Sequence, residues 1–240
     1  MELGIAGRVA LVTAASKGLG FASAMALARE GAKVAICARG ETALREAERR
    51  LAAHCEVLAM TSDVTARSAP RELVAATVER YGTLDILVGN AGGPPPGRAL
   101  ELGETELEAA LNANLLASVR LVREAVPYMR GGGWGRICLI ASTTVKQPIP
   151  TLAASTTARS GLWGWAKSAA GDLFGDGITL NVACPGSHAT ERAQMLGGAG
   201  EEPVGEPADF GKVVAFLCSE PAKFVSGTTV LVDGGRTVGL

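Results

Sequence analysis

The chain has 240 residues, of which 48% are hydrophobic and 20% charged, and its formal net charge is −1. This composition is typical of a soluble globular protein, and the small net charge without a basic block argues against a nucleic acid partner. No apolar run is long enough to span a bilayer and no signal-peptide pattern is present, so we expect a cytoplasmic protein with no membrane partner. Five scattered cysteines and two histidines predict free thiols and no metal site.

The first predicted element is an apolar strand over residues 9–12, which runs into a glycine-bearing turn and then a helix over about 21–28. The start of such a helix presents free backbone N–H groups and the positive end of the helix dipole, and together these bind phosphate. Gly18 and Gly20 allow the backbone to approach a pyrophosphate, and the helix to approach the strand. On this pattern alone, an ordinary strand-to-helix turn remains the alternative.

Six further apolar runs predict strands, at 33–38, 56–60, 84–88, 135–141, 178–183 and 228–232. Helical patterns lie between them, over 41–53, 71–81, about 104–129, 152–173 and 208–219, and the stretch before the last helix is short and irregular. Continuous apolar strands that alternate with helices predict a parallel sheet covered on both faces. We therefore expect an α/β protein with a single doubly wound Rossmann domain over residues 1–240 and a seven-stranded parallel sheet.

Ligands of this fold bind beyond the carboxyl ends of the strands, where the strand order reverses. The residues at those ends are therefore the candidates for a functional site. They are Thr13–Gly20, Ala38–Arg39, Asp63–Val64, Asn90–Gly92, Ser142 and Pro185–Thr190.

These strand-end residues together resemble the short-chain dehydrogenase/reductase family, and the 3-oxoacyl-acyl-carrier-protein reductases within it, over nearly the whole chain. The motifs are Thr13 with Gly18-x-Gly20, Asp63-Val64, Asn90-Ala91-Gly92, Asn114, Ser142, Pro185-Gly186 with Thr190, and Val232-Asp233-Gly234-Gly235. One departure is Ala14, where the family usually has glycine. Alanine fits a tight turn there if its φ angle is negative.

The resemblance implies a dinucleotide cofactor. The residues that it places at this cofactor are Thr13, Ala15, Ser16, Lys17, Gly18, Leu19, Gly20, Arg39, Asp63, Val64, Asn90, Ala91, Gly92, Arg159, Pro185, Gly186 and Thr190. An acidic residue after the second strand would favour NAD, but Ala38 and Arg39 stand there, and Lys17 lies in the glycine turn. Two cations suit a 2′-phosphate, so we predict NADP(H). The alternatives are that both cations are solvated surface charges and that Asp63 is a cap or turn residue.

In the family, a serine polarises the substrate carbonyl, a tyrosine transfers the proton, and a lysine one helical turn later holds the nicotinamide ribose. The resemblance gives the role of that serine to Ser142, and the support of a water chain to Asn114. The tyrosine and lysine positions fall on Ser155 and Arg159, as in a divergent subgroup that the chain is similar to. A guanidinium stays protonated and a serine hydroxyl is far less acidic than a phenol, so we expect weaker proton transfer.

We consider four other residues as proton donors, and three of them are poor candidates. We expect Tyr81 and Tyr128 to be packing residues remote from the crevice, and His188 to be a loop or solvent-facing residue. Lys146, just past Ser142, is a further candidate.

The resemblance implies an NADP(H)-dependent oxidoreductase that acts on a small carbonyl or alcohol substrate through Ser142, Asn114, Ser155 and Arg159. The alternatives are a catalytically lapsed nucleotide-binding or partner subunit, and a non-redox isomerase or dehydratase. Retention of Ser142 and Asn114 favours an enzyme.

The resemblance also implies substrate loops at about 93–100 and 187–205, which contain few distinctive groups. The second is short and carries Gly197, Gly198, Gly200 and Pro203, so water could replace tyrosine as the proton source. Family members are commonly tetramers, so we expect a homo-oligomer, a tetramer or a dimer, through the helices at 104–129 and 152–173 and the last strand.

Overall fold

The structure is a computed structural model that describes residues 2–197 and 204–239. Its strands are β1 Val9–Val12, β2 Lys33–Ala38, β3 Val57–Thr61, β4 Ile86–Gly89, β5 Gly135–Ile140, β6 Ile178–Pro185 and β7 Thr229–Val232. Its helices are α1 Gly18–Arg29, α2 Glu41–Ala52, α3 Ala69–Tyr81, α4 Glu104–Leu111, α5 Ala117–Gly132, α6 Ala153–Phe174, α7 Glu191–Met195 and α8 Pro207–Leu217, with a π-helix at Asn112–Leu116 and a 3-10 turn at Thr143–Val145.

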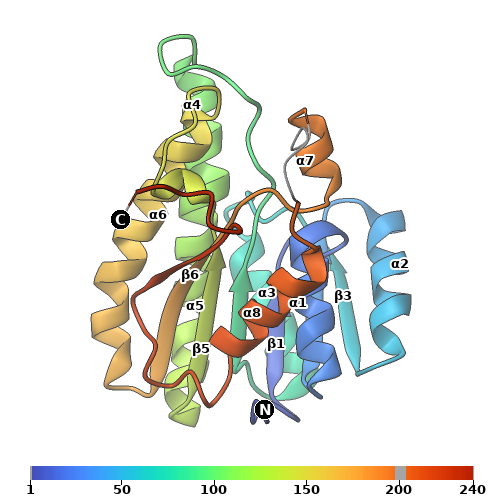
Figure 1. The fold of residues 1–240 in the computed structure, drawn as a ribbon. Helices are drawn as coiled ribbons and strands as arrows, with labels where there is room; N and C mark the ends of the chain where they lie inside the picture. The colour runs from blue at the N-terminus through green and yellow to red at the C-terminus, as the bar shows by residue number, and fades with distance from the viewer. Residues whose placement is uncertain (1, 198–203, 240) are drawn as a thin grey trace.

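The seven strands form one parallel sheet in the order β3-β2-β1-β4-β5-β6-β7, which confirms the predicted doubly wound Rossmann fold (Figure 1). β1 lies between β2 and β4, with Val12 opposite Ile36 on one side and Val88 on the other. The direction in which the chain adds strands reverses at this pair, β1 and β4. In folds of this kind the ligand crevice opens above such a reversal.

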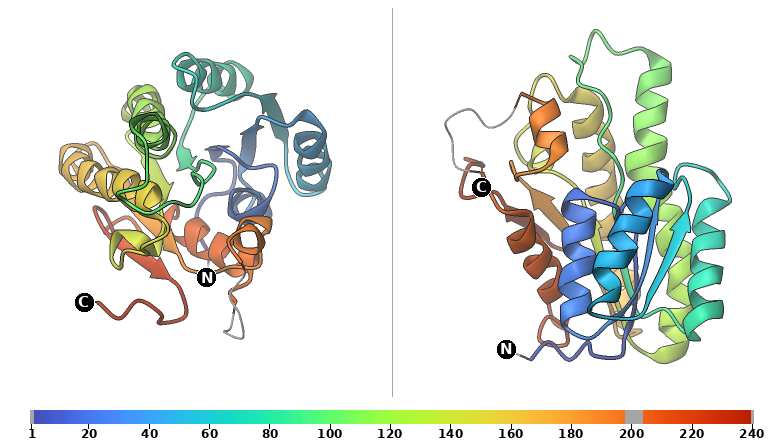
Figure 2. Two further views of the ribbon diagram at one scale, coloured as in Figure 1. Left: turned by 90° about the horizontal axis from the view of Figure 1, so that it is seen from above. Right: turned by 90° about the vertical axis from the view of Figure 1, so that its right-hand side faces the viewer.

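Helices cover both faces of the sheet (Figures 1 and 2). One buried cluster joins α1, α2 and α8 to the sheet through side chains such as Leu27, Leu44 and Phe210. A second cluster on the opposite face joins α3, α5 and α6 through Leu73 and Leu121, among others. Because helices cover both faces of the sheet, the side chains on both sides of each inner strand are largely buried. These strands therefore contain continuous apolar runs rather than an alternating pattern.

The element boundaries differ from the sequence-based prediction at three places. α1 begins at Gly18 rather than at Phe21, because the glycine turn is itself the first turn of the helix. The predicted helix over 104–129 is interrupted by the π-helix and continues past Pro127 to Gly132. The stretch predicted to be irregular contains the short helix α7, which Thr190 caps through a hydrogen bond from Ala193 N to its Oγ1.

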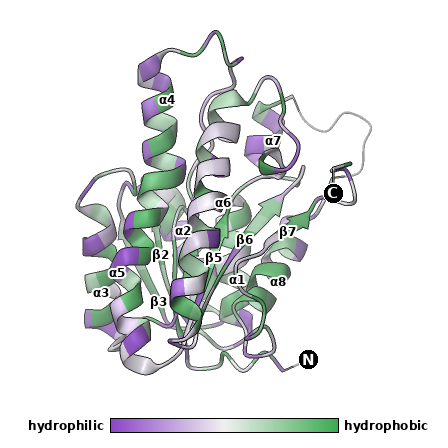
Figure 3. Ribbon diagram, turned by 90° about the vertical axis from the view of Figure 1, so that its left-hand side faces the viewer, coloured by the Kyte–Doolittle hydropathy of each residue, from purple (hydrophilic) through white to green (hydrophobic). Residues whose placement is uncertain are grey.

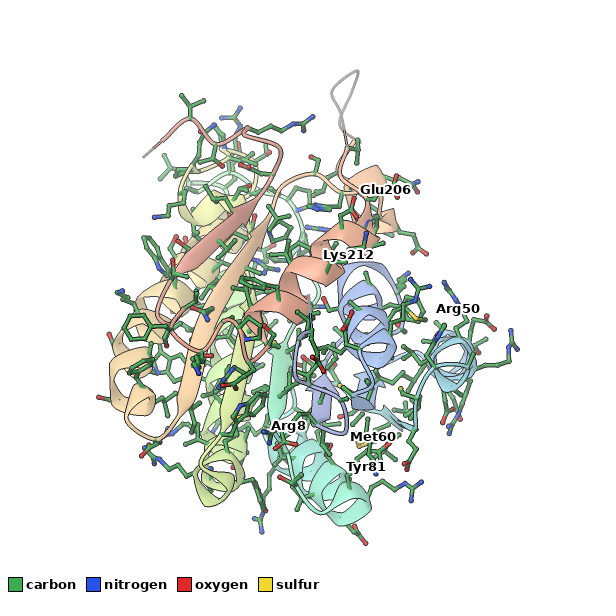
Figure 4. The ribbon with its side chains drawn as sticks, turned by 60° about the horizontal axis from the view of Figure 1, so that its bottom comes forward. Arg8, Arg50, Met60, Tyr81, Glu206 and Lys212 are labelled. Carbon is green, nitrogen blue, oxygen red and sulfur yellow. The ribbon has the colours of Figure 1, made fainter. Side chains whose placement is uncertain are left out.

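At the amino-terminal ends of the strands, a buried arginine holds the foot of the sheet together. The Arg136 side chain is 2% exposed and donates hydrogen bonds to the backbone carbonyls of Ser219, Gly135 and Gly177, and to Glu220 Oε2 at 3.1 Å. Its guanidinium also lies 4.2 Å from the centre of the Trp134 ring. Arg8, labelled at this edge in Figure 4, lies 4.0 Å from the centre of the same ring.

Other expectations have mixed outcomes. All five cysteines are free, and among the helices that the structure describes none is long and apolar enough to cross a membrane. Tyr81 packs against the second cluster, and burial raises the pKa of its hydroxyl to about 12. Tyr128 is 41% exposed, so its assignment as a packing residue was wrong.

Candidate active site

A cleft of about 2070 Å³ lies along the carboxyl ends of the strands. It is lined by most of the site residues expected from the sequence, namely Ser16, Lys17, Gly18, Leu19, Arg39, Asp63, Val64, Asn90, Ala91, Gly92, Asn114, Ser142, Ser155, Arg159, Pro185, Gly186 and Thr190. Thr13, Ala15 and Gly20 are buried behind this surface and do not line it. The fold therefore brings the predicted cofactor residues and the predicted catalytic residues to one cavity.

The glycine turn is fixed to β4 by a hydrogen-bonded pair. Thr13 Oγ1 donates to the Asn90 carbonyl at 2.7 Å and accepts from the Asn90 N–H at 2.8 Å. Asn90 Nδ2 donates to the Ala14 carbonyl at 3.2 Å. A Cβ at Gly20 would lie 2.4 Å from that same carbonyl oxygen, so only glycine lets α1 approach the turn this closely.

Ala14 adopts a conformation that the sequence analysis did not expect. Its φ angle is +47°, in the left-handed region, so the condition under which alanine fits this turn, a negative φ, is not met. Asn90 and the close approach of Gly20 fix the Ala14 carbonyl from two sides. The turn therefore holds a strained alanine where glycine would be relaxed.

Three charged residues surround the outer part of the cleft. Lys17 forms an exposed ion pair with Glu191 of α7, which joins the glycine turn to the second predicted substrate loop. Arg39 is exposed at the end of β2. Asp63 Oδ1 accepts hydrogen bonds from Thr65 N at 3.0 Å and Thr65 Oγ1 at 2.8 Å, and these hold the pKa of Asp63 below its usual value. Asp63 is thus a turn residue as well as a lining residue.

The two retained polar residues of the predicted site lie at irregular backbone. Asn114 is 2% exposed within the π-helix, and its Oδ1 has no hydrogen-bond partner among the described residues. Single π turns of this kind are rare and occur often at functional sites. Ser142 follows β5, and its Oγ accepts a hydrogen bond from Thr144 N at 3.2 Å.

Ser155 and Arg159 lie one turn apart on α6, and each is 7% exposed. Arg159 Nη1 donates to the carbonyls of Ile140 at 2.9 Å and Ala141 at 2.8 Å, at the end of β5. Its Nε has no partner among the described residues. Burial lowers the pKa of Arg159 to about 10, so the guanidinium is still charged at neutral pH.

Two further residues were weighed as proton donors, and of these His188 lines the cleft. His188 lies in the loop between β6 and α7, as expected, but it is 4% exposed and does not face solvent. Its ring packs edge-to-face on Phe210 of α8 with centroids 5.4 Å apart, and its Nδ1 lies 3.2 Å from the Gly186 carbonyl. Lys146 places its ammonium 4.1 Å from the centre of the Trp163 ring and does not line the cleft.

The sequence analysis missed Arg192, which connects the two predicted substrate loops. Arg192 Nη2 donates to the Pro94 carbonyl at 2.5 Å, and a Cβ on Gly93 would lie 3.0 Å from Arg192 Nε. The expectation that these loops contain few distinctive groups was therefore wrong. The available signal was Thr190, a preferred N-cap residue, which predicts a helix start that places Arg192 in the first turn. Gly198, Gly200 and Pro203 lie outside the described residues.

Comparison with known proteins gives matches over most of the chain. A family whose description is enoyl-(acyl carrier protein) reductase matches residues 13–237. Human dehydrogenase/reductase SDR family member 4 is 33% identical over 246 residues, which cover 96% of this chain and 88% of that protein. The 3-oxoacyl-(acyl-carrier-protein) reductase MabA of Mycobacterium tuberculosis is 32% identical over 241 residues, with 97% and 94% covered.

Among solved structures, the L-sorbose reductase of Gluconobacter frateurii in complex with NADPH and L-sorbose is similar over 100% of both chains. Its TM-score is 0.94 and its sequence identity is 29%. The similarity in sequence and the similarity in structure both extend beyond the glycine turn to the whole sheet and the helices on both of its faces.

Proposed function

This chain belongs to the short-chain dehydrogenase/reductase family, and from that membership we propose that it is an NADP(H)-dependent oxidoreductase acting on a carbonyl or alcohol substrate. The observation that supports this most strongly is the single cleft that joins the glycine turn to Ser142, Asn114, Ser155 and Arg159. We propose that residues 1–240 form one dinucleotide-binding domain. In this proposal the substrate binds between the two substrate loops, at 93–100 and 187–205.

The residues present fit a dinucleotide. Lys17, the N-cap of α1, makes no side-chain cap, so the first N–H groups of that helix are available to a phosphate. Gly18 has a φ of +59°, which allows the backbone to turn sharply. Gly20 leaves no room for a Cβ, so the helix packs closely against the turn, and the backbone N–H groups there are not covered by side chains of these two residues. The cleft volume of about 2070 Å³ exceeds the roughly 300–1,000 Å³ of a typical small-molecule site, which leaves space for a cofactor and a substrate together.

The charges at the outer end favour the phosphorylated cofactor. β2 ends at Ala38 and is followed by Arg39, so no carboxylate stands at the end of this strand to accept hydrogen bonds from ribose hydroxyls. Arg39 and Lys17 would hold a 2′-phosphate by charge-assisted hydrogen bonds. The Lys17–Glu191 ion pair is exposed and therefore weak, so a phosphate group can replace the carboxylate.

When bound, the nicotinamide ring supplies or accepts a hydride. The chain's own residues position the substrate and handle the proton. The Ser142 hydroxyl orients the substrate oxygen, and the buried Asn114 Oδ1 offers an unpaired acceptor to a water molecule. Ser155 stands where the family has its tyrosine, so water that reaches the cleft is the proton source in this proposal. The charged Arg159 holds the ribose through its remaining N–H groups and takes no part in proton transfer.

Two alternatives keep the same cleft. In the first, a lapsed enzyme binds NADP(H) as a regulatory or partner subunit, which the loss of the tyrosine and lysine favours. In the second, the site carries out isomerisation or dehydration without net redox change. Binding without turnover would point to the first alternative. A product with the same oxidation level as the substrate would point to the second.

The experiment that tests the proposal combines binding and turnover. Calorimetry should give saturable binding of NADPH with weaker binding of NADH, and NADPH absorbance should fall in the presence of a ketone or an oxoacyl thioester. The double variant Ser155→Tyr with Arg159→Lys should then turn over faster, by roughly 100-fold or more, because a good general acid contributes 10²–10⁴-fold. Binding of neither reduced dinucleotide would overturn the proposal.

We also propose a homo-oligomer, a tetramer or a dimer, in the cytoplasm. Figure 3 looks onto α5 and α6, and much of α6 there is neither strongly hydrophobic nor strongly hydrophilic. Gly161, Gly164 and Ser168 are exposed on this helix, and such small residues let a second helix approach closely. The free thiols agree with a reducing compartment.

A further inference from the structure

Arg192 lies where the two substrate loops meet, and it is held there from one side. Its Nη2 donates to the Pro94 carbonyl at 2.5 Å, and its guanidinium lies against Gly93. The side chain is half-buried and lines the same cleft as Ser142 and Ser155. A guanidinium has five N–H donors, and among the described residues only the Pro94 carbonyl accepts from this one. Most of its donors are therefore available to a molecule in the cleft.

A second guanidinium, that of Arg159, belongs to the same cleft lining as Arg192. The charge of Arg192 contributes to the lowered pKa of Arg159, after the larger effect of burial. Within the ranges 2–197 and 204–239, no carboxylate lies within ion-pair distance of either group. Two other lining cations do have such partners: Lys17 pairs with Glu191, and Lys212 pairs with Asp209 at 2.8 Å.

The acidic residues that line the cleft are engaged elsewhere or exposed. Asp63 accepts from Thr65, and Asp233 accepts from the backbone of Gly235 and Thr237. The four glutamates that line the cleft are also hydrogen-bonded, paired or exposed. Glu106 Oε2 accepts from Gly103 N at 2.6 Å, Glu191 pairs with Lys17, and Glu30 and Glu206 are exposed.

Figure 4 labels Glu206, the N-cap residue of α8, and Lys212, which lies on that helix. Within the described part of the chain, Glu206 is exposed and forms no ion pair with Arg159 of α6. The inner part of the cleft thus holds two positive charges without a negative partner from the described chain.

We propose that the substrate carries a carboxylate, and that Arg192 binds this carboxylate and so determines substrate specificity. This inference rests on the proposed function and narrows its substrate class to oxo acids and hydroxy acids. A planar carboxylate matches the fork of a guanidinium and accepts two parallel hydrogen bonds from it. The Pro94 carbonyl fixes the guanidinium in one orientation, so little side-chain entropy remains to be lost on binding.

The first test compares acids with their esters. Linear 2-oxo and 3-oxo acids of increasing length, each beside its methyl ester, are titrated into the NADP⁺-loaded protein by calorimetry. At least one acid should bind roughly 10- to 100-fold more tightly than its ester, because hydrogen bonds between charged groups are stronger than neutral ones. If no acid binds better than its ester, the inference is wrong.

The second test removes the guanidinium. Arg192→Gln should abolish the preference for the acid, and Arg192→Lys should restore part of it, because the charge returns without the fork. The matched control is Arg130→Gln, which removes an exposed guanidinium paired with Asp176 at the far end of α5. The control should keep the wild-type preference. An unchanged preference in Arg192→Gln would also overturn the inference.

The affinity for NADPH separates this inference from the proposed function. Arg192→Gln should bind NADPH as the wild type does; an equal loss of NADPH and acid affinity would make Arg192 a cofactor clamp and overturn the inference. If the wild type binds no NADPH, the proposed function fails. In that case the acid and ester titrations are repeated on the cofactor-free protein. Tighter binding of an acid than of its ester would support the carboxylate site, and equal binding would contradict it.

Discussion

At the scale of single residues, the glycine turn shows how tertiary contacts override a local preference. Ala14 is the only non-glycine residue with a positive φ in the part of the chain that the structure describes. A left-handed alanine costs about 1–2 kcal/mol, and here Asn90 and the packing of Gly20 against the turn impose that cost. The strain is local, because the residues on either side have ordinary φ angles.

Ala14→Gly should therefore stabilise the protein. Glycine relieves the strain but gains more entropy on unfolding, so we expect the free energy of unfolding to rise by roughly 0.5–1 kcal/mol. Urea denaturation monitored by circular dichroism measures it. The matched control Ala15→Gly changes a buried neighbour with an ordinary φ and should lower the free energy of unfolding. A loss of stability in Ala14→Gly would contradict this account of the turn.

Side-chain positions in the loops could be predicted less well than those at the strand ends. The residues at strand ends follow from the order of apolar runs, and Ser142, which follows β5, lines the cleft at the expected place. His188 and Arg192 depend instead on contacts with Phe210 and Pro94, which are far away in the sequence. No local pattern encodes such contacts, so burial of an imidazole and bridging by a guanidinium both escaped prediction.

At the scale of secondary structure, the π-helix at Asn112–Leu116 forms part of the lining of the cleft. The sequence favours an uninterrupted helix there, because its residues are mostly strong helix formers. We attribute the interruption to two hydrogen bonds of Asn112. Its Nδ2 donates to the Thr65 carbonyl at 3.0 Å, and its Oδ1 accepts from Arg120 at 2.8 Å. The π turn brings Asn114 into the lining of the cleft.

Asn112→Ala should loosen this element. The substitution removes two hydrogen bonds, so we expect the free energy of unfolding to fall by roughly 1–2 kcal/mol, measured from urea denaturation midpoints. Hydrogen exchange should quicken in 112–116 before it does elsewhere. Arg123→Ala, an exposed change on α5, should stay within about 0.5 kcal/mol of wild type. Equal stability of both variants would mean that Asn112 does not hold the π turn.

At the scale of the whole molecule, the sequence was sufficient for the sheet but not for the assembly. Seven apolar runs separated by helical patterns leave few alternatives to a parallel sheet covered on both faces, and the observed strand order agrees. How the chain associates depends on which surface is complementary to a second copy. Helix α6 offers exposed small residues, and Gly164 has no atom within 4 Å of the position that a Cβ would occupy.

Gly164→Arg should therefore leave each subunit folded but prevent association through α6. Light scattering after size exclusion should give a multiple of the chain mass for the wild type, and the chain mass or a smaller assembly for the variant. Gly131→Arg, which places the same side chain in open space near the end of α5, should assemble as the wild type does. A wild-type mass in Gly164→Arg would exclude α6 from the interface.

The anchor at the foot of the sheet has a consequence for how this protein can change. Arg136 fastens the start of β5, the loop before β6 and the end of α8 at the pole opposite the cleft. The buried hydrogen bonds that stabilise the sheet and the residues that line the cleft therefore lie at opposite ends of the strands. A substitution among the residues that line the cleft therefore leaves the hydrogen bonds of Arg136 in place. Because the two sets of residues are separate, we expect single substitutions in the cleft to change activity more than they change stability.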